Sequence, residues 1–458
     1  MVKCSASVFL SLLFLSLFSI DSAKSYGTND GMEQWGYVQV RPKAHMFWWH
    51  YRSPKPVKNG PTPWPTVLWL QGGPGASGVG IGNFEEIGPL DYNLNPRNST
   101  WLQFADLLFV DNPVGTGYSF VENTSLLVTT DEEAASDLTE LLKQLYNKNL
   151  EMQKSPLYIF AESYGGKYAV TLGLSVVKAV KSGDLKLKLG GVAIGDSWIS
   201  PEDFVFSWGP LLLDLSRLDS NAAANSNSMA EKIKQQIEAG EYGQATNSWG
   251  DLENYIISNS NSIDFYNFLL DSDMDPLGAA ASSSNNGFNA GRSFRRYARY
   301  LSMKGESPSD TLTKIMNGVI KDKLKIIPKN ITWQEESNEV FTALSNDFMK
   351  PRINEVDELL SLGVNVTIYS GQLDIICATK GTEAWVQKLK WDGLNNFTNL
   401  VRTPLYCEGS DGGTKGFYRS YRNLHFYWVL HAGHFVPYDQ PCIALRLLKE
   451  TTQSPASY

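Results

Sequence analysis

Cysteine, histidine and basic residues are scarce in this sequence, and each shortage excludes a class of protein. The 458 residues include 4 cysteines and 5 histidines, too few for a disulfide scaffold or a cysteine-rich zinc module. Lysine and arginine total 40 against 48 aspartates and glutamates, the net charge is −8, and no basic run stands out. A nucleic-acid partner is therefore not expected. Beyond the N-terminus no run of about 18 uncharged apolar residues occurs, so we expect no membrane anchor in the mature form.

The chain does contain enough apolar residues for a large core. Hydrophobic residues make up 42% of the sequence, which excludes global disorder. The length is typical of two or three domains, or of one large α/β domain that carries insertions.

The N-terminus has the pattern of a secretory signal peptide. Lys3 precedes an apolar run from Val8 to Ile20, which at about 13 residues is too short to span a bilayer. Small residues follow near Ser22 and Ala23, so we expect cleavage close to residue 23. Residues 1–23 would then be removed and the mature chain would enter the secretory pathway.

Two further features bear on that compartment. Processing would leave Cys377, Cys407 and Cys442, so at most one disulfide forms, and its pairing stays open. The predicted glycosylation sites are the five Asn-X-Ser/Thr sequons: Asn98, Asn123, Asn330, Asn365 and Asn396. Among these, Asn365 opens an apolar run that we expect to be a core strand, which disfavours it as a glycan acceptor.

Strands alternate with helical patterns over the first 200 residues, which predicts βαβ units and a parallel sheet. From about Pro201 to Glu335 helical patterns mix with polar stretches, such as 220–228 and 279–291, which predicts a mostly helical insertion with mobile loops. The α/β pattern then resumes. The sequence thus predicts a core in two parts, 24–200 and 336–458, split by an insertion over 201–335. The expected strands are 64–70, 105–111, 157–160, 191–194, 364–369 and 424–430, and the expected helices 130–146, 168–180 and 340–362.

The strongest chemical signal lies where the strand ending at Phe160 passes into a helix, in Glu162-Ser-Tyr-Gly-Gly166. A nucleophile elbow holds a serine on such a turn, with its Oγ above the carboxyl edge of the sheet. It needs small neighbours, because strand and helix pass closely, and Ala161, Gly165 and Gly166 meet that need. Ser163 is therefore the candidate nucleophile. The alternative is a glycine-rich loop with an incidental serine.

A serine is a weak nucleophile until a base takes its proton, and behind an elbow the acid and then the histidine follow in chain order. His45 and His50 precede the serine, and His425 lies inside an aromatic strand. His431 and His434 follow that strand, and we favour His434 because it opens the next loop. As an H-x-x-H metal site the pair lacks an intervening Glu and a close third ligand, so no metal is predicted.

The acid should end the strand that precedes this histidine. Asp374 stands at the carboxyl end of the strand 364–369, where its carboxylate would hold the imidazole tautomer and stabilise the imidazolium. Asp347 and Asp357 fall in a predicted helix and are expected on a solvated face. The alternative for Asp374 is a loop-capping aspartate.

An oxyanion hole needs two backbone N–H groups aimed at the developing charge. The residue after the nucleophile, Tyr164, should supply one. An early glycine-rich loop after a strand should supply the other, and Gly72-Gly-Pro-Gly75 fits.

With these residues in order, the chain resembles the serine carboxypeptidase family, whose members are α/β hydrolases. The chain further resembles the retinoid-inducible subgroup and its plant relatives in two blocks, Asp196-Ser-Trp-Ile-Ser-Pro201 and Lys323-Leu-Lys-Ile-Ile-Pro328. The resemblance implies an α/β-hydrolase fold, a mostly parallel sheet flanked by helices, with the helical insertion as a lid. The main matching blocks are Trp69-Leu-Gln-Gly-Gly-Pro-Gly75, Asp111-Asn-Pro-Val-Gly-Thr-Gly-Tyr-Ser119, Glu162-Ser-Tyr-Gly-Gly166 and His431-Ala-Gly-His-Phe-Val-Pro437.

The resemblance also implies an activity, the release of C-terminal amino acids from peptides at acidic pH, without a cofactor. It makes Ser163 the nucleophile, His434 the base and Asp374 its orienter. The implied oxyanion hole is formed by the amides of Gly73 and Tyr164. By analogy alone, a homodimer is possible.

The resemblance further implies how the substrate is held. Its terminal carboxylate would be bound by Trp69, Gln71 and Glu162, with Glu86 paired to Glu162. Two close carboxyls cannot both stay ionised, so a shared proton can donate to the carboxylate in acid. That requirement suits a vacuolar or lysosomal site, or secretion into an acidic space.

Departures from the family leave alternatives open. Gln71 replaces the usual asparagine, and Ala76 stands where many relatives have a disulfide cysteine. The insertion also lacks cysteines, so substrate preference does not transfer. The chain could instead be an acyltransferase with the same three residues, or a non-catalytic binding protein on the same scaffold.

Overall fold

The computed structural model describes residues 25–57, 60–271, 308–407 and 413–457 of the chain. The predicted signal peptide and the polar stretch 279–291 lie outside these residues. None of the helices in the described parts combines the length and the apolar character needed to cross a bilayer.

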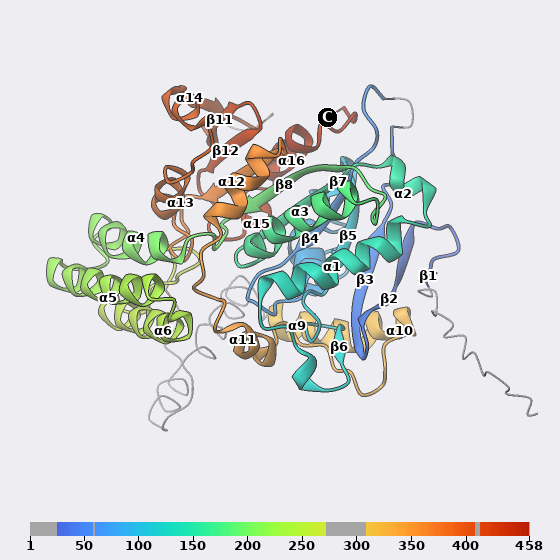
Figure 1. Ribbon diagram of the computed structural model, residues 1–458, viewed down its shortest axis with the longest axis horizontal. Coiled ribbons are helices and arrows are strands. Elements are labelled where there is room, and N and C mark those ends of the chain that lie inside the picture. The colour runs from blue at the N-terminus through green and yellow to red at the C-terminus, as the bar shows by residue number, and fades with distance from the viewer. Residues whose placement is uncertain (1–24, 58–59, 272–307, 408–412, 458) are drawn as a thin grey trace, which may run out of the picture.

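A twelve-stranded sheet runs through the centre of the described structure (Figure 1). Its order is β1-β2-β3-β5-β4-β7-β8-β9-β12-β11-β10, with β6 paired to β3. The six strands from β5 to β12 in this order are parallel, and the outer strands are antiparallel. The strands are β1 Ser25–Gly27, β2 Glu33–Arg41, β3 Ala44–Tyr51, β4 Thr66–Leu70, β5 Asp106–Val110, β6 Phe120–Val121, β7 Leu157–Glu162, β8 Leu189–Gly195, β9 Val366–Gly371, β10 Thr403–Leu405, β11 Gly416–Tyr421 and β12 Leu424–Val429.

Helices cover both faces of the sheet. The strands β4, β5, β7 and β9 are buried on both sides, which is why they form nearly continuous apolar runs. One face, turned to the viewer in Figure 1, carries α1 Asp131–Tyr146, α3 Gly165–Lys181 and α12 Ile353–Ser361. The other carries the π-helix η1 Gly78–Ile87, α15 Val436–Asp439 and α16 Pro441–Thr452. The fold is therefore an α/β hydrolase, as the sequence predicts.

The remaining helices are short or lie beside the sheet. Among them, α4, α5 and α6 pack on one another and extend away from the sheet, at the left of Figure 1, whereas α9 and α10 lie along its lower edge. Their bounds are α2 Leu150–Lys154, α4 Pro201–Asp214, α5 Ser220–Glu238, α6 Tyr242–Asn259, α9 Pro308–Ile315, α10 Lys321–Leu324, α11 Asn338–Leu344, α13 Thr379–Val386 and α14 Leu394–Asn399, with single turns η2 Trp101–Gln103, η3 Thr124–Leu126 and η4 Met316–Ile320.

The predicted strands correspond to β4, β5, β7, β8, β9 and β12, and the predicted helices over 130–146 and 168–180 to α1 and α3. The prediction of a polar loop over 220–228 is wrong, because these residues form the first half of α5. Asp219 caps that helix by accepting a hydrogen bond from the Ala222 amide at 2.7 Å. Ala223 and Ser226 are buried, so small side chains allow close packing against α4 and α6.

The prediction of one helix over 340–362 is also wrong. The chain leaves the helical path between α11 and α12, over residues 345–352, where Pro351 has no N–H to donate and disfavours helix at the residue before it. Asp347 lies in this break and is 4% exposed. The Asp357 carboxylate accepts hydrogen bonds from the backbone amides of Lys390 and Trp391, with N···O distances of 2.8 and 2.9 Å. The expectation of a solvated face is therefore wrong for Asp347, whereas Asp357 is half-buried.

The break is held by a buried ion-pair network around Arg352. Its side chain is 1% exposed and pairs with Asp131 at 2.9 Å, Asp347 at 2.9 Å, Glu132 at 2.6 Å and Glu355 at 3.0 Å. The network ties α1 to the segment before α12. When a cation that several buried carboxylates share is removed, their negative charges are left buried without a compensating partner.

We expect Arg352→Met to lower the free energy of unfolding by about 3–5 kcal/mol, since it leaves Asp131 and Asp347 with Lys167 as their remaining buried cation. Urea unfolding followed by fluorescence measures the change. Lys350→Met is the matched control, because Lys350 is 36% exposed and such a surface pair contributes less than about 1 kcal/mol. Equal losses in the two variants would contradict the prediction.

The cysteine pairing that the sequence leaves open is settled by the fold. Cys407 and Cys442 form a disulfide, with Cα atoms 6.1 Å apart. Cys377 is a buried free thiol. The disulfide joins the segment after β10 to α16, which are 35 residues apart in sequence.

Candidate active site

The predicted residues gather at one edge of the sheet. Parallel strands present their carboxyl ends at the same edge, and β7, β8, β9 and β12 are consecutive in this parallel region. Ser163 follows β7, Asp196 follows β8, Asp374 follows β9 and His434 follows β12. Ligands of open α/β sheets bind at this carboxyl edge.

Ser163 sits on a strained turn between β7 and α3. Its φ angle is 60°, a left-handed conformation that few residues other than glycine adopt. Its amide donates to the Gly195 carbonyl at 3.0 Å, and its own carbonyl accepts from the Gly166 and Trp198 amides, both at 3.0 Å. These bonds hold the turn from the neighbouring strand, as a nucleophile elbow requires.

Three glycines allow the turn to exist. A Cβ on Gly72 would lie 2.5 Å from Ser163 Cβ, and one on Gly165 would lie 2.3 Å from the Leu70 carbonyl oxygen. A Cβ on Gly166 would lie 2.3 Å from the side chain of Ser197. Each distance is far inside van der Waals contact, so backbone segments approach here as closely as glycine permits.

The structure brings His434 and Asp374 together. His434 Nδ1 lies 2.8 Å from Asp374 Oδ2, and both side chains are fully buried. His434 Nε2 has no hydrogen-bond partner among the described residues, so its bond to Ser163 is not formed in this structure. Such bonds are often long before substrate binds. His431, the alternative histidine, is exposed.

Burial sets the protonation of this pair. It lowers the pKa of His434 to about 4, although the charges of Asp196 and Asp264 oppose the shift. Burial raises the pKa of Asp374, while hydrogen bonds from the Cys377 amide and with Asp196 lower it. The imidazole is therefore neutral and able to accept a proton above about pH 4.

Gly73 and Tyr164, whose amides are the predicted oxyanion donors, line the same cavity as Ser163. Gly73 has φ 102°, and a Cβ there would meet the Gly75 amide at 2.8 Å. Within the part of the chain that the structure describes, neither the Gly73 nor the Tyr164 amide donates a hydrogen bond to a carbonyl. Both N–H groups are thus available to an oxyanion. The Tyr164 hydroxyl donates to Asp131 at 2.8 Å, which links this residue to the Arg352 network.

The four predicted carboxylate-binding residues form one buried chain. Trp69 Nε1 donates to Gln71 Oε1 at 2.6 Å, and Gln71 Nε2 donates to Glu162 Oε1 at 3.0 Å. Burial raises the pKa of both Glu86 and Glu162, and the charge of Glu86 and a hydrogen bond between the two carboxyls raise that of Glu162 further. The pair therefore retains a shared proton in acid. Gln71 spans the distance to Glu162 that a shorter asparagine would leave open.

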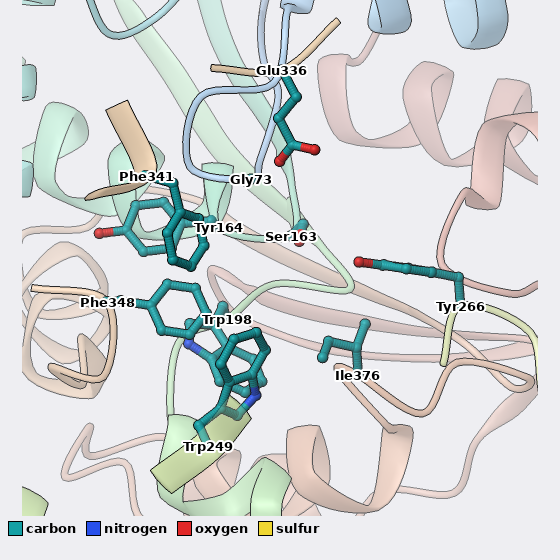
Figure 2. A pocket seen from close by; sticks show the side chains of 10 residues that line it. All are labelled: Gly73, Ser163, Tyr164, Trp198, Trp249, Tyr266, Glu336, Phe341, Phe348 and Ile376. Carbon is teal, nitrogen blue, oxygen red and sulfur yellow. The ribbon is translucent and has the colours of Figure 1, made fainter. Parts of the chain in front are cut away.

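A cavity of about 430 Å³, including its open mouth, lies beside Ser163 (Figure 2). Figure 2 shows the Glu336 carboxyl and the Tyr266 hydroxyl directed toward Ser163, with an aromatic wall on another side. The Tyr266 ring also lies edge-on to His434, with centroids 5.1 Å apart. The lining residues are Gly73, Ser163, Tyr164, Trp198, Trp249, Tyr266, Glu336, Phe341, Phe348 and Ile376.

Several of these residues were not identified from sequence. Trp249 and Tyr266 lie in the region predicted as an insertion, where no local motif marks them. Glu336 reaches the cavity because its backbone pairs with Ala76, a long-range contact. Asp196 did carry a signal, since it directly follows a predicted strand at the carboxyl edge.

Comparisons with known proteins identify the family of this chain. Residues 25–454 match the family model described as serine carboxypeptidase. Serine carboxypeptidase-like 51 of Arabidopsis thaliana is 63% identical over 93% of both chains, and the retinoid-inducible serine carboxypeptidase of Rattus norvegicus is 47% identical over 98% of both. The crystal structure of the prohormone-processing carboxypeptidase Kex1 from Saccharomyces cerevisiae, 22% identical, superposes with a TM-score of 0.70 over 92% of this chain and 91% of that one. The chain belongs to the serine carboxypeptidase family and is a serine-type carboxypeptidase homologue.

Proposed function

We propose that this protein removes the C-terminal residue from peptides through a covalent acyl-enzyme formed on Ser163. One observation carries the proposal: Ser163 stands on a left-handed turn, in one cavity with Gly73 and Tyr164, at the sheet edge that holds the bonded Asp374–His434 pair. That combination supplies a nucleophile, a base with its orienter, and oxyanion donors.

In the proposed reaction, Ser163 Oγ attacks the last peptide carbonyl while His434 Nε2 takes the hydroxyl proton. The amides of Gly73 and Tyr164 donate to the oxyanion, and Asp374 stabilises the imidazolium. The C–N bond then breaks, and the proton passes from His434 to the departing amino acid. Water attacks the acyl ester with His434 again as base, which releases the shortened peptide and restores Ser163.

The carboxyl pair supports recognition of a C-terminal carboxylate in acid. Glu162 directly precedes Ser163 in the chain, and in this proposal the substrate carboxylate reaches the buried pair of Glu86 and Glu162 when the peptide is bound. While the pair is protonated it can donate to a carboxylate. When the pH rises through its elevated pKa, the pair becomes anionic and repels that carboxylate.

We expect kcat/KM for peptides to fall as the pH rises from 5 toward neutrality, mainly through KM. Glu162→Gln keeps an N–H donor at every pH, so its profile should be flatter, with binding at pH 5 weakened about tenfold. Steady-state kinetics at pH 5, 6, 7 and 8 measure both effects. Glu231→Gln, an exposed carboxyl on α5, should keep the wild-type profile. An unchanged slope in Glu162→Gln would contradict this role.

A secretory location is part of the proposal. The Cys407–Cys442 disulfide is typical of an oxidising compartment. Four sequon asparagines, Asn98, Asn123, Asn330 and Asn396, are exposed. Asn365 is half-buried and donates to the Gly190 carbonyl at 3.3 Å, so we expect glycans on the other four. An acidic vacuole, lysosome or extracellular space would suit the carboxyl pair.

Mass spectrometry of peptide products at pH 5 tests the proposed function. Loss of one C-terminal residue at a time supports it. An acyltransferase with the same three residues would instead move an acyl group from a glucose ester to an alcohol and leave the peptide intact. A non-catalytic binding protein would do neither and would not react with a fluorophosphonate.

A further inference from the structure

Asp196 lies between the two turns that carry the proposed nucleophile and its acid. It is 1% exposed and has φ 37°, a conformation that side chains other than Asn, Asp and Gly rarely adopt. Nothing in the proposed reaction uses this carboxyl. Its position is nevertheless central, because β8 lies between β7 and β9.

The backbone around Asp196 holds the nucleophile turn from both sides. The Ser163 amide donates a hydrogen bond to the carbonyl of Gly195, the residue before Asp196, at 3.0 Å. Two residues after it, the Trp198 amide donates to the Ser163 carbonyl at 3.0 Å. A shift of Asp196 would therefore move the turn that presents Ser163 Oγ.

The side chain of Asp196 holds the acid turn. The Gly371 amide donates to Asp196 Oδ1 at 2.8 Å, and the Gly371 carbonyl accepts the Asp374 amide at 3.3 Å. The Asp196 amide itself donates to the Tyr369 carbonyl at 2.9 Å. Asp196 is thus bonded to the end of β9, next to the Asp374 turn, and its chain neighbours Gly195 and Trp198 are bonded to the Ser163 turn.

The second oxygen, Asp196 Oδ2, is buried and has no hydrogen-bond partner of normal geometry among the described residues, although the Ser370 side chain interacts with this carboxyl. The Asp374 carboxyl is its neighbour and forms a hydrogen bond with the Asp196 side chain. A bond between two carboxyls requires a proton on one of them. Asp374 must be ionised to stabilise an imidazolium, so that proton belongs on Asp196.

Resting on the proposed function, we propose that Asp196 is a positioning residue: it joins the Ser163 turn to the Asp374 turn and, in its protonated form, donates the hydrogen bond that holds Asp374 against His434.

The electrostatic surroundings agree with this assignment. Burial and the charge of Asp374 raise the pKa of Asp196 well above its ordinary value, although His434 and the hydrogen bonds from Gly371 and Ser370 lower it. Asp196 is therefore protonated in acid and ionises as the pH rises, after which it repels Asp374. The titratable groups that interact with Asp196 are Glu162 at the end of β7, Tyr369 on β9, Asp374 and Cys377 after β9, and His434 after β12.

The test measures the rate of fluorophosphonate labelling at pH 5 and pH 8, because this probe lacks a C-terminal carboxylate and bypasses the Glu86–Glu162 pair. Asp196→Ala should label about 10- to 100-fold more slowly at pH 5, as expected for a misplaced catalytic group. Asp196→Asn keeps an acceptor for Gly371 and a donor for Asp374. It should label close to the wild-type rate at pH 5 and faster than wild type at pH 8.

Asp106→Asn is the matched control, a half-buried aspartate at the start of β5 whose pKa burial also raises, and it should label like wild type at both pH values. Wild-type labelling by Asp196→Ala, or an Asp196→Asn variant with the wild-type pH dependence, would overturn the role of Asp196 alone. If Asp196→Ala does not fold, the pH comparison with Asp196→Asn decides. A wild-type protein that is not labelled on Ser163 would overturn the proposed function and this inference together.

Discussion

Replacing Ser163 with alanine should lower kcat for peptide hydrolysis by about 10⁶-fold, the scale found when an activated serine is removed from such a triad. The substitution deletes only Oγ, and the backbone bonds of the turn to Gly195, Gly166 and Trp198 do not involve that atom. Peptide binding should therefore persist in Ser163→Ala. Product analysis by mass spectrometry and equilibrium binding of a peptide measure the two quantities separately.

The matched control is Ser228→Ala, which removes an exposed hydroxyl on α5 and should leave kcat unchanged. Fluorophosphonate labelling gives a second measurement, because the probe forms a bond to serine Oγ and releases fluoride. Wild type and Ser228→Ala should be labelled, and Ser163→Ala should not. Persistent labelling of Ser163→Ala would assign the nucleophile to another residue.

Asp374→Asn should lower kcat by about 10⁴-fold with little change in KM. The carboxylate fixes which nitrogen of His434 carries the proton, through the 2.8 Å contact with Nδ1. An amide at this position can donate to Nδ1 and so stabilise the tautomer with its proton on Nε2, which cannot accept from serine. Steady-state kinetics at pH 5 measure the effect.

Asp357→Asn provides a control, because that carboxyl accepts two backbone amides on the far side of α12 and lies outside the proposed machinery. Its kcat should match wild type. A loss below about tenfold in Asp374→Asn would contradict the assigned orienter. In that case a second buried carboxyl near His434, Asp196 or Asp264, would have to supply the charge.

Chain order predicts much of the site because each residue follows a strand. Ser163, Asp374 and His434 come directly after apolar runs, and parallel strands place their carboxyl ends together. The glycines at 72, 73, 165 and 166 mark sharp turns in the sequence, although most of the segments that they allow to approach lie far away in the chain. Local signals of this kind are complete within about five residues of sequence.

Local patterns failed where distant partners decide the conformation. The pattern around Asp347 is helical, yet the chain breaks there because Pro351 disfavours helix at the residue before it and because Arg352 binds carboxylates from α1 and from its own segment. The polar stretch from Ser220 to Ser228 resembles a loop, yet it becomes helical because its small residues pack between α4 and α6.

By itself the sequence determined the family, the α/β-hydrolase fold, and the order and identity of the candidate catalytic residues, since these depend on motifs contiguous in the chain. Only the tertiary structure decided that Cys407 pairs with Cys442, that Glu336 and Tyr266 face Ser163, and that the Asp196 side chain accepts a hydrogen bond from the Gly371 amide. Each of these is a contact between segments far apart in sequence, and its existence depends on how the strands are ordered in the sheet rather than on any local pattern.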